Sequence, residues 1–355
     1  MKASVQLTPP KNSTGVSQIV HNNQASEPIT AYCLSNGPTT ATILNYGATL
    51  SKFTINNIDV LLGFDDVFDY TKSHPMFGVI VGRTCNRIGN GQFELNGTTY
   101  NLPINNGPNS LHGGLVGLDK HYWDSKILSQ NPPAVVFTTQ SKHLDQGYPG
   151  TIEVAITYTL LNGDLSIDAV AKLIGNEVDE TVINITSHPY FNLSGGISPT
   201  VEDNEIQFHH VTGTLKVNST QIPTGEVLTT STNPEMFFNE PATFGSRLPL
   251  VQQFRVDSHL QTQSGCVSVK DPHTKIELRV LTDACGFQLY TGNWLENITS
   301  KKSHPCGIYN NYSGFCIEPS QPPDAINLPA FRQSVILKKG EEWKQKIVYR
   351  LLQNE

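Results

Sequence analysis

The feature that most constrains the fold is a succession of short segments in which apolar and polar residues alternate. Clear examples are residues 135–137, 153–160 and 165–170, with turn residues between them. A period of two places successive side chains on opposite faces, which is typical of a strand buried on one side. No segment of ten or more residues has the apolar spacing of an amphipathic helix. The sequence therefore predicts an all-β protein, a large antiparallel β-sandwich.

Two hairpins are marked by turn residues that accept a left-handed backbone. Asn96-Gly97 lies between the alternating segments 93–95 and 100–102, and Asn56-Asn57 is the turn of a second predicted hairpin. Asn-Gly is a strong signal because both central residues of the tightest hairpin turn have positive φ. Residues 182–186 predict a further strand. Parallel α/β folds are disfavoured, since their strands need helical crossovers.

Domain organisation is predicted to be simple. A chain of 355 residues is long for one domain. However, no proline-rich or serine-rich linker divides it, no internal repeat is visible, and all-β domains are often large. We therefore expect a single domain over residues 1–355, in which about residues 1–28 form an N-terminal extension or the first strand.

Composition restricts the partners and the compartment. The net charge of −7 is spread without long blocks, which argues against nucleic-acid binding. No apolar run is long enough to cross a membrane, and residues 1–20 lack the apolar centre of a secretory signal. The six cysteines form no Cys-x-x-Cys pair, which favours free thiols. We expect a cytoplasmic protein without a nucleic-acid or membrane partner.

Four polar residues stand at positions where a buried strand has no use for them. Glu318 follows an apolar run and precedes a proline-rich loop, and His188 follows a β segment and lies beside Tyr190. His112 precedes two glycines, and Arg87 lies in a glycine-flanked loop. Taken singly, each is explained as well by a solvated charge or a hydrogen-bonded histidine. Together they offer a carboxylate base and an imidazole acid.

Motifs of several common enzyme classes are absent. The absence of Gly-x-Ser-x-Gly argues against an α/β-hydrolase nucleophile, and the absence of Gly-x-x-x-x-Gly-Lys-Ser/Thr removes the usual phosphate cradle. Neighbouring strand residues such as His209 and His210 point to opposite faces and do not chelate one metal together. Other histidines, among them His259 and His304, lie in polar stretches and receive no role.

Five motifs, in the same order along the chain, closely resemble those of the galactose mutarotase (aldose 1-epimerase) family. They are Gly82-Arg83-x-x-Asn86-Arg87, Asn109-x-Leu111-His112-Gly113-Gly114, Thr186-x-His188-x-Tyr190-Phe191-Asn192-Leu193, Gln288-x-Tyr290-Thr291-Gly292-Asn293 and Gly314-Phe315-x-Ile317-Glu318. The resemblance runs from about residue 30 to the C-terminus. It implies a β-supersandwich domain without metal or cofactor, and interconversion of the α and β anomers of galactose and glucose.

The resemblance also implies roles for individual residues. Glu318 looks like the general base and His188 like the general acid. The residues that resemble those that position the sugar are Asn86, Arg87, His112 and Gln288. Tyr190 is suited to packing on the apolar face of the sugar. The sugar-binding aspartate of the family matches best at Asp257, where Ser258 replaces the usual histidine. We expect an aldohexose as partner and a monomer or homodimer.

Three alternatives stay open. A glycoside hydrolase needs two carboxylates at the scissile bond, which Asp257 and Glu318 would supply. A hexose-6-phosphate 1-epimerase needs additional basic residues, and the segment His112-Gly113-Gly114 supplies none. A non-catalytic sugar sensor or lectin on the same fold is expected to lack the acid or the base, and both His188 and Glu318 are present.

Overall fold

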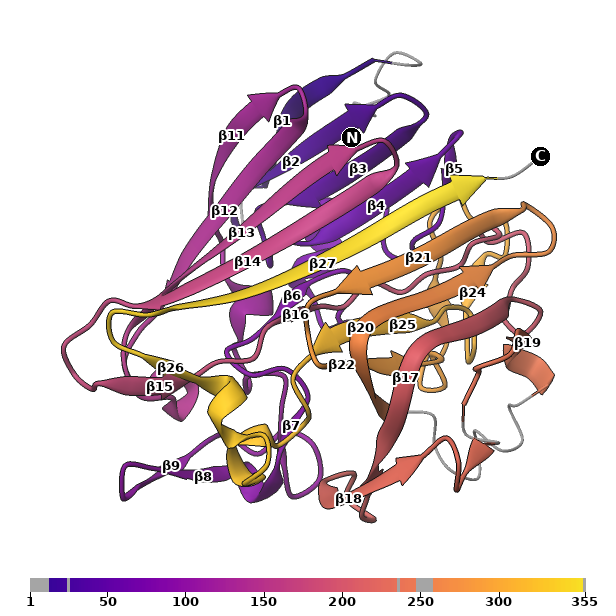
Figure 1. Cartoon of the computed structure of the whole chain (residues 1–355). Coiled ribbons are helices and arrows are strands. Elements are labelled where there is room, and N and C mark those ends of the chain that lie inside the picture. The colour runs from indigo at the N-terminus through magenta and orange to yellow at the C-terminus, as the bar shows by residue number, and fades with distance from the viewer. Residues whose placement is uncertain (1–12, 24–25, 235–236, 247–257, 354–355) are drawn as a thin grey trace.

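The structure, a computed structural model, describes residues 13–23, 26–234, 237–246 and 258–353. Two sheets dominate it (Figure 1). The first sheet has five antiparallel strands in sequence order: β1 Gly15–Asn23, β2 Ser26–Asn36, β3 Thr39–Leu44, β4 Leu50–Ile55 and β5 Ile58–Asp59. Strand β1 thus contains much of the predicted N-terminal segment that lies within the described residues.

The second sheet contains 12 strands, all paired antiparallel, and supplies two of the site-bearing strands, β22 and β25. Its order is β11-β12-β13-β14-β27-β21-β20-β17-β18, with β19 on β17 and with β22 joined to both β20 and β25. The bounds are β11 Asp124–Gln130, β12 Pro133–Ser141, β13 Ile152–Leu161, β14 Asp164–Leu173, β17 Glu205–Val217, β18 Pro223–Thr229, β19 Ala242–Thr243, β20 Ser258–Lys270, β21 Ile276–Thr282, β22 Gly286–Tyr290, β25 Cys316–Ser320 and β27 Glu342–Gln353.

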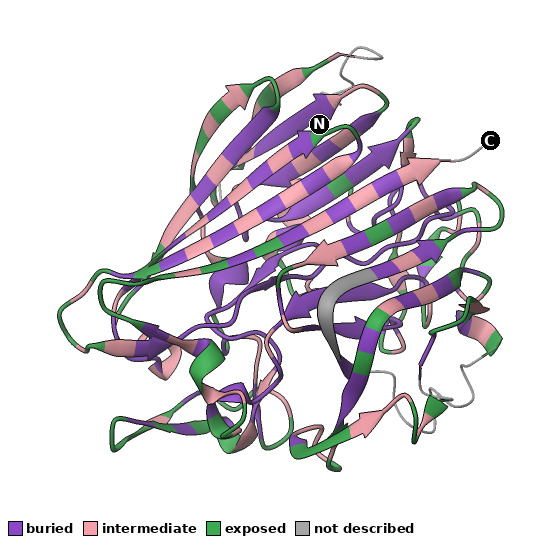
Figure 2. Cartoon of the chain, viewed as in Figure 1, coloured by how far each residue is buried: buried purple, intermediate pink, exposed green. Residues whose placement is uncertain are grey.

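Alternation of burial along these strands follows the alternation in the sequence. In β13 and β14 nearly every second residue is buried, and Figure 2 shows the resulting bands. The segments predicted at 135–137, 153–160 and 165–170 all fall inside strands β12, β13 and β14. The prediction of an all-β antiparallel sandwich is confirmed.

The core lies between the two sheets. The strands of the first sheet lie behind β11–β14 in Figure 1, and apolar side chains from both sheets form one cluster. Phe53 from the first sheet and Ile156 and Ile167 from the second are at most 1% exposed. Each such side chain contributes about 1.5–3 kcal/mol when it is removed from water. The Tyr158 hydroxyl adds a polar link by donating to Ala48 O at 2.8 Å.

The predicted turns and strands can be compared with the structure one by one. Asn96 and Gly97 have φ of 52° and 72° between β8 (Gln92–Leu95) and β9 (Thr98–Asn101), which confirms that hairpin. Asn56 and Asn57 join β4 to β5 with φ of 49° and 66°, so the second hairpin is confirmed too.

The single strand predicted at 182–186 is wrong. Its ends pair with different partners: β15 (Glu180–Val182) with β26 (Ile336–Lys338), and β16 (Thr186–Ser187) with β6 (Ile80–Val81). Between them, Asn184 exchanges backbone hydrogen bonds with the segment around residue 84 instead of continuing either ladder. Local alternation does not reveal which neighbour a strand pairs with.

The remaining elements are short. Two strand pairs are β7 (Arg87–Ile88) with β10 (Ser110–Leu111), and β23 (Ile298–Thr299) with β24 (Ile308–Tyr309). The 3-10 helices are η1 Val67–Thr71, η2 Gly89–Gly91, η3 Leu118–Lys120, η4 Asp145–Gly147, η6 Ala325–Asn327 and η7 Arg332–Val335. Among the described residues, no helix has the length and apolar character needed to span a membrane.

A buried ion pair ties the segment between β22 and β25 to the first sheet. Lys301 is 4% exposed and Asp59 3%, and Lys301 Nζ lies 2.9 Å from Asp59 Oδ2. His304, which received no role from the sequence, is also buried, and its Nε2 lies 2.9 Å from Asp59 O. These contacts fix the segment that leads into the strand carrying Glu318.

Candidate active site

Glu318 and Gln288 face the site from paired strands. Residues of β25 and β22 are all buried, and the antiparallel register sets Gln288 directly opposite Glu318. Directly opposed residues present their side chains on the same face of a sheet. Glu318 lies within β25, two residues before its end, so the strand holds the carboxylate more firmly than the following loop would.

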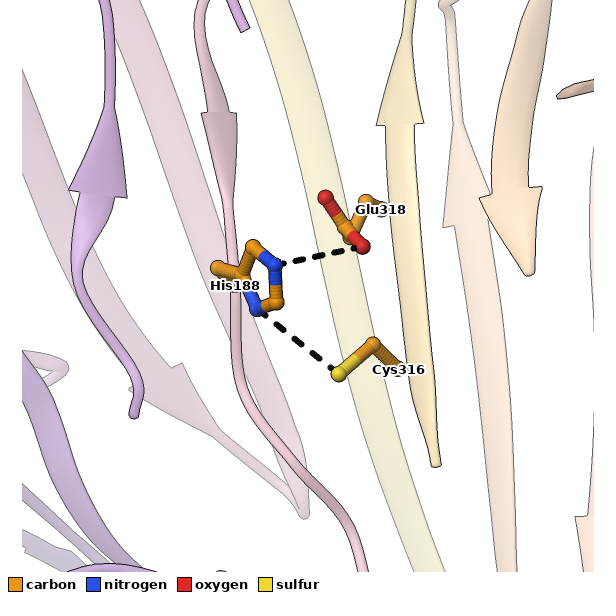
Figure 3. Close-up of side chains that lie close together, drawn as sticks. All are labelled: His188, Cys316 and Glu318. Atoms are coloured by element: carbon orange, nitrogen blue, oxygen red, sulfur yellow. Dashed lines mark hydrogen bonds and ion pairs between the residues drawn. The ribbon is translucent and has the colours of Figure 1, made fainter. Parts of the chain in front are cut away.

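His188 lies directly after β16 and is held by its backbone. Its N–H donates to Val79 O, its carbonyl accepts from Gly78 N, and the residue is 5% exposed. Its Nε2 lies 3.5 Å from Glu318 Oε1, as Figure 3 shows. The carboxylate and the imidazole, 130 residues apart in the sequence, therefore form a buried pair.

Burial governs the charge of this imidazole. It lowers the pKa of His188 to about 4, because a buried ring loses the solvation of its protonated form. A carboxylate at 3.5 Å favours the protonated form. A proton on His188 at neutral pH therefore depends on its ion pair with Glu318.

Asn86 links three other predicted site residues. Its Nδ2 donates to Gln288 Oε1 at 2.9 Å, and its Oδ1 accepts from Arg87 N at 2.8 Å. Its backbone N–H donates to His112 Nδ1 at 3.2 Å, and its carbonyl accepts from His112 N. Both Asn86 and His112 have left-handed φ, 58° and 53°, a conformation that Asn and His adopt more readily than most residues.

The contacts of His112 define its protonation state. Because Nδ1 accepts the Asn86 N–H, the hydrogen of the neutral ring is on Nε2. Burial, the nearby ring of His188 and the charge of Arg87 lower the pKa of His112 well below its ordinary value. His112 is thus a neutral hydrogen-bond donor in this site.

Arg87 and Tyr190 complete the set of predicted residues. Arg87 Nε donates to Asn106 Oδ1 at 2.9 Å, which orients the guanidinium. The Tyr190 ring stacks on His188 at 5.2 Å between centroids, and the His112 ring meets His188 edge-on at 5.4 Å. The His188 ring is therefore packed from two sides.

These side chains line one cavity of about 550 Å³. Seven of the eight residues predicted from the sequence contribute to its wall: Asn86, Arg87, His112, His188, Tyr190, Gln288 and Glu318. Asp257 lies outside the described residues. Among the described residues of the wall, Glu318 is the sole carboxylate and Arg87 the sole lysine or arginine.

Sequence reasoning missed several residues of the wall. Tyr290 and Trp294 line the cavity, and Trp294 is 67% exposed at its rim. Tyr290 stands two residues after Gln288 on β22, so strand periodicity was a signal for it. Thr220 and Gln221 come from a polar turn after β17, and no local pattern indicates that this turn reaches the site.

A metal is a poor explanation of the cluster formed by His188, Cys316 and Glu318. One ligand atom each from His188, Cys316 and Glu318 lies within 4.8 Å of the others. However, the two close contacts use opposite nitrogens of the ring, Nε2 to Glu318 and Nδ1 to Cys316 Sγ at 3.7 Å. A single ion binds only one of these nitrogens. The arrangement fits a hydrogen-bonded chain through the imidazole better than a coordination site.

Comparison with known proteins decides the family. The family model described as aldose 1-epimerase matches residues 30–350. The chain belongs to this family. Galactose mutarotase of Sus scrofa is 36% identical over 314 residues, which cover 85% of this chain and 87% of that protein. The resemblance inferred from the five motifs is confirmed.

Solved structures agree on the fold. A GalM/aldose epimerase homologue from C. elegans matches with a TM-score of 0.81 and 27% identity, over 97% of this chain and 100% of that one. A galactose 1-epimerase from Lactobacillus acidophilus NCFM matches with a TM-score of 0.84 and 23% identity, with the same coverage. The two-sheet architecture that carries the site is thus the family's own.

Proposed function

We propose that this protein interconverts the α and β anomers of an aldohexose, with galactose and glucose as substrates. The observation that carries the proposal is the buried pair in which His188 Nε2 lies 3.5 Å from Glu318 Oε1 at the cavity wall. Relatives named galactose mutarotase support the choice of substrate.

The pair suits the chemistry of mutarotation. Glu318 takes the proton of the C1 hydroxyl while His188 protonates the ring oxygen, so that the ring opens to an aldehyde. Rotation about C1–C2 presents the other face of the carbonyl, and the same two groups working in reverse close the ring. The two oxygens concerned are bonded to one carbon, so the acid and base must be close neighbours, as these side chains are.

Protonation of His188 is the demanding part of this mechanism. A neutral imidazole that gave up its only N–H would become an anion, so the working acid is the imidazolium. Burial opposes that form, and the adjacent Glu318 carboxylate stabilises it. We infer that the resting enzyme carries the proton as a His188–Glu318 ion pair, which the sugar separates when it binds. Released from its counter-ion, the imidazolium becomes a stronger acid.

The other residues of the wall bind and orient the sugar. Arg87, Gln288 and the Nε2–H of His112 are fixed hydrogen-bond partners for hydroxyl groups, because Asn86 and Asn106 hold them in place. Such preorganised partners discriminate between sugars, since a wrong hydroxyl leaves a buried polar group unpaired. Asp257 remains proposed as a further hydroxyl ligand.

The rival functions receive less support from the cavity. Glu318, the one carboxylate of its described wall, is paired with His188, so a glycoside hydrolase would depend on Asp257, outside the described residues, for its second carboxylate. Its single guanidinium is already bonded to Asn106, which makes a sugar phosphate a less suitable ligand. A cytoplasmic location stays a proposal, supported by the free thiols among the described cysteines.

The test follows the optical rotation of freshly dissolved α-D-galactose. We expect the protein to accelerate the decay, and Glu318→Gln and His188→Asn each to remove about 10²–10⁴-fold of the acceleration. The exposed Glu226→Gln variant is the control and retains full activity. If the optical rotation decays as fast with both site variants as with the unmodified protein, the assignment of acid and base is wrong. No acceleration by the unmodified protein would instead support a sugar sensor.

A further inference from the structure

Cys316 contacts the proposed acid, yet the mechanism above does not use it. It stands two residues before Glu318 on β25, and residues two apart project from the same face of a strand. Its side chain is fully buried, and Sγ lies 3.7 Å from His188 Nδ1. One imidazole therefore meets both side chains, with Nε2 toward Glu318 and Nδ1 toward Cys316 (Figure 3).

These two contacts restrict the ring in different ways. Partners at opposite edges, Glu318 and Cys316, oppose rotation of the imidazole about its bond to Cβ. Tyr190 stacks on its face, with ring planes at 26°, and opposes tilting. A ring held from three sides keeps Nε2 directed at the cavity, where the proton must be transferred.

The thiol also suits both protonation states of the ring. In the proposed cycle His188 gives its Nε2 proton to the sugar and takes it back, so Nδ1 must keep its own proton meanwhile. Sulfur accepts that Nδ1–H weakly, both in the resting imidazolium and in the neutral ring that remains once the Nε2 proton is on the sugar. A carboxylate at this place would only accept and would make the ring more basic, hence a weaker acid.

We propose that Cys316 is a positioning residue for the reaction, which partners His188 Nδ1 in both protonation states and so reserves Nε2 for proton transfer. This inference rests on the proposed mutarotase function. The simpler alternative is that Cys316 fills space, since it belongs to an apolar cluster that includes Tyr190, Tyr290 and Tyr309.

Three substitutions separate positioning from packing. Cys316→Ala removes the sulfur, Cys316→Val fills the space without a hydrogen-bonding group, and Cys316→Ser keeps a donor and acceptor at shorter reach. We expect the Ala and Val variants to lower kcat about 10- to 100-fold with little change in KM, by analogy with a metal-bound histidine that loses its hydrogen-bonding partner. Ser should recover part of the loss. Cys33→Ala, a buried thiol in the first sheet, is the control and keeps its kcat.

A second readout is the titration of His188 itself, followed by ¹⁵N NMR of the ring. The groups that face this ring are Glu318 and Cys316 on β25 and His112 after β10, with Tyr190 stacked on it and His74 farther away. Without the sulfur we expect the midpoint to fall and the alkaline limb of kcat to move to lower pH. Cys316→Ser should move both back.

Each outcome has a definite reading. If Ala and Val keep the kcat and the ring titration of the unmodified protein, the positioning role is refuted. If Cys316→Val keeps the kcat of the unmodified protein and Cys316→Ala does not, or if Cys316→Ser recovers none of the lost kcat, packing is the explanation and the proposal fails. The NMR titration does not depend on turnover. An inactive unmodified protein would therefore refute the mutarotase function, while the titration would still decide whether Cys316 acts on His188.

Discussion

Replacing Lys301 by Met is the sharpest test of how the segment before β25 is held. Lys301 Nζ uses all three of its hydrogens: it donates to Asp59 Oδ2 at 2.9 Å, Ser51 O at 2.6 Å and Leu61 O at 3.0 Å. Burial lowers the pKa of Lys301, and the Asp59 carboxylate opposes this shift. The Asp59 carboxylate therefore keeps the Lys301 ammonium charged, and the ammonium in turn neutralises the buried carboxylate.

The expected cost follows from this geometry. Met keeps the apolar stem but leaves a buried carboxylate and two carbonyl oxygens without that partner. Breaking a buried pair by removing one member costs about 3–5 kcal/mol. For 355 residues, an unfolding entropy of about 2.1 cal/mol/K per residue sums to about 0.75 kcal/mol/K. A loss of about 4 kcal/mol then lowers Tm by about 5 °C.

Urea denaturation and thermal scans of four proteins make the measurement: the unmodified chain, Lys301→Met, Asp59→Asn and the double variant. We expect the double variant to lose less than the sum of the two single losses, because the uncompensated charge is gone. The exposed Lys72, which pairs with Asp69, provides Lys72→Met as a control with an unchanged transition. A Lys301→Met protein within about 1 kcal/mol of the unmodified one would refute the reasoning, since the pair would then not be effectively buried.

Two further predictions concern acid and the cavity rim. Burial lowers the pKa of His74 and His259 to about 4 each. Between about pH 6.5 and 4 the unfolded chain therefore binds more protons than the folded protein. The free energy of unfolding keeps its full value above this window and is lower at pH 5 by up to about 2 kcal/mol per histidine. A urea midpoint that is equal at pH 7.5 and 5 would contradict this. Trp294→Ala should raise the KM measured by polarimetry severalfold and leave kcat within twofold, because Trp294 lies at the rim of the cavity and not at the acid–base pair. A variant with a lower kcat and an unchanged KM would contradict this prediction.

The sequence allowed the local structure to be predicted well where one physical cause acts alone. Alternation gave the strands β12 to β14, because the burial of one face is decided by side chains two residues apart. The Asn96-Gly97 turn was equally predictable, since its backbone conformation excludes most other residues. The strand at 182–186 failed because its two ends pair with strands more than 90 residues away.

Buried polar groups show the other limit of sequence reasoning. His304 and Lys301 stand in a polar, Ser- and Lys-containing stretch that is typical of a surface loop, yet both are buried. Both side chains bind to Asp59, on β5 of the first sheet. No pattern within either segment indicates the partner, because the ion pair exists only once the segment is docked on the first sheet.

The candidate site combines both cases. The motif around Glu318 was recognisable, and strand periodicity alone places Cys316 on its face of β25. What the sequence did not show is that the single imidazole of His188 contacts both Glu318 and Cys316. That depends on where β16 ends, because His188 is fixed there by backbone hydrogen bonds to residues 78 and 79. The geometry of the proposed acid is thus set by the pairing of β16 with β6, and its protonation by two side chains of β25. A substitution that weakens the β16–β6 pair should therefore impair catalysis without touching any residue of the cavity.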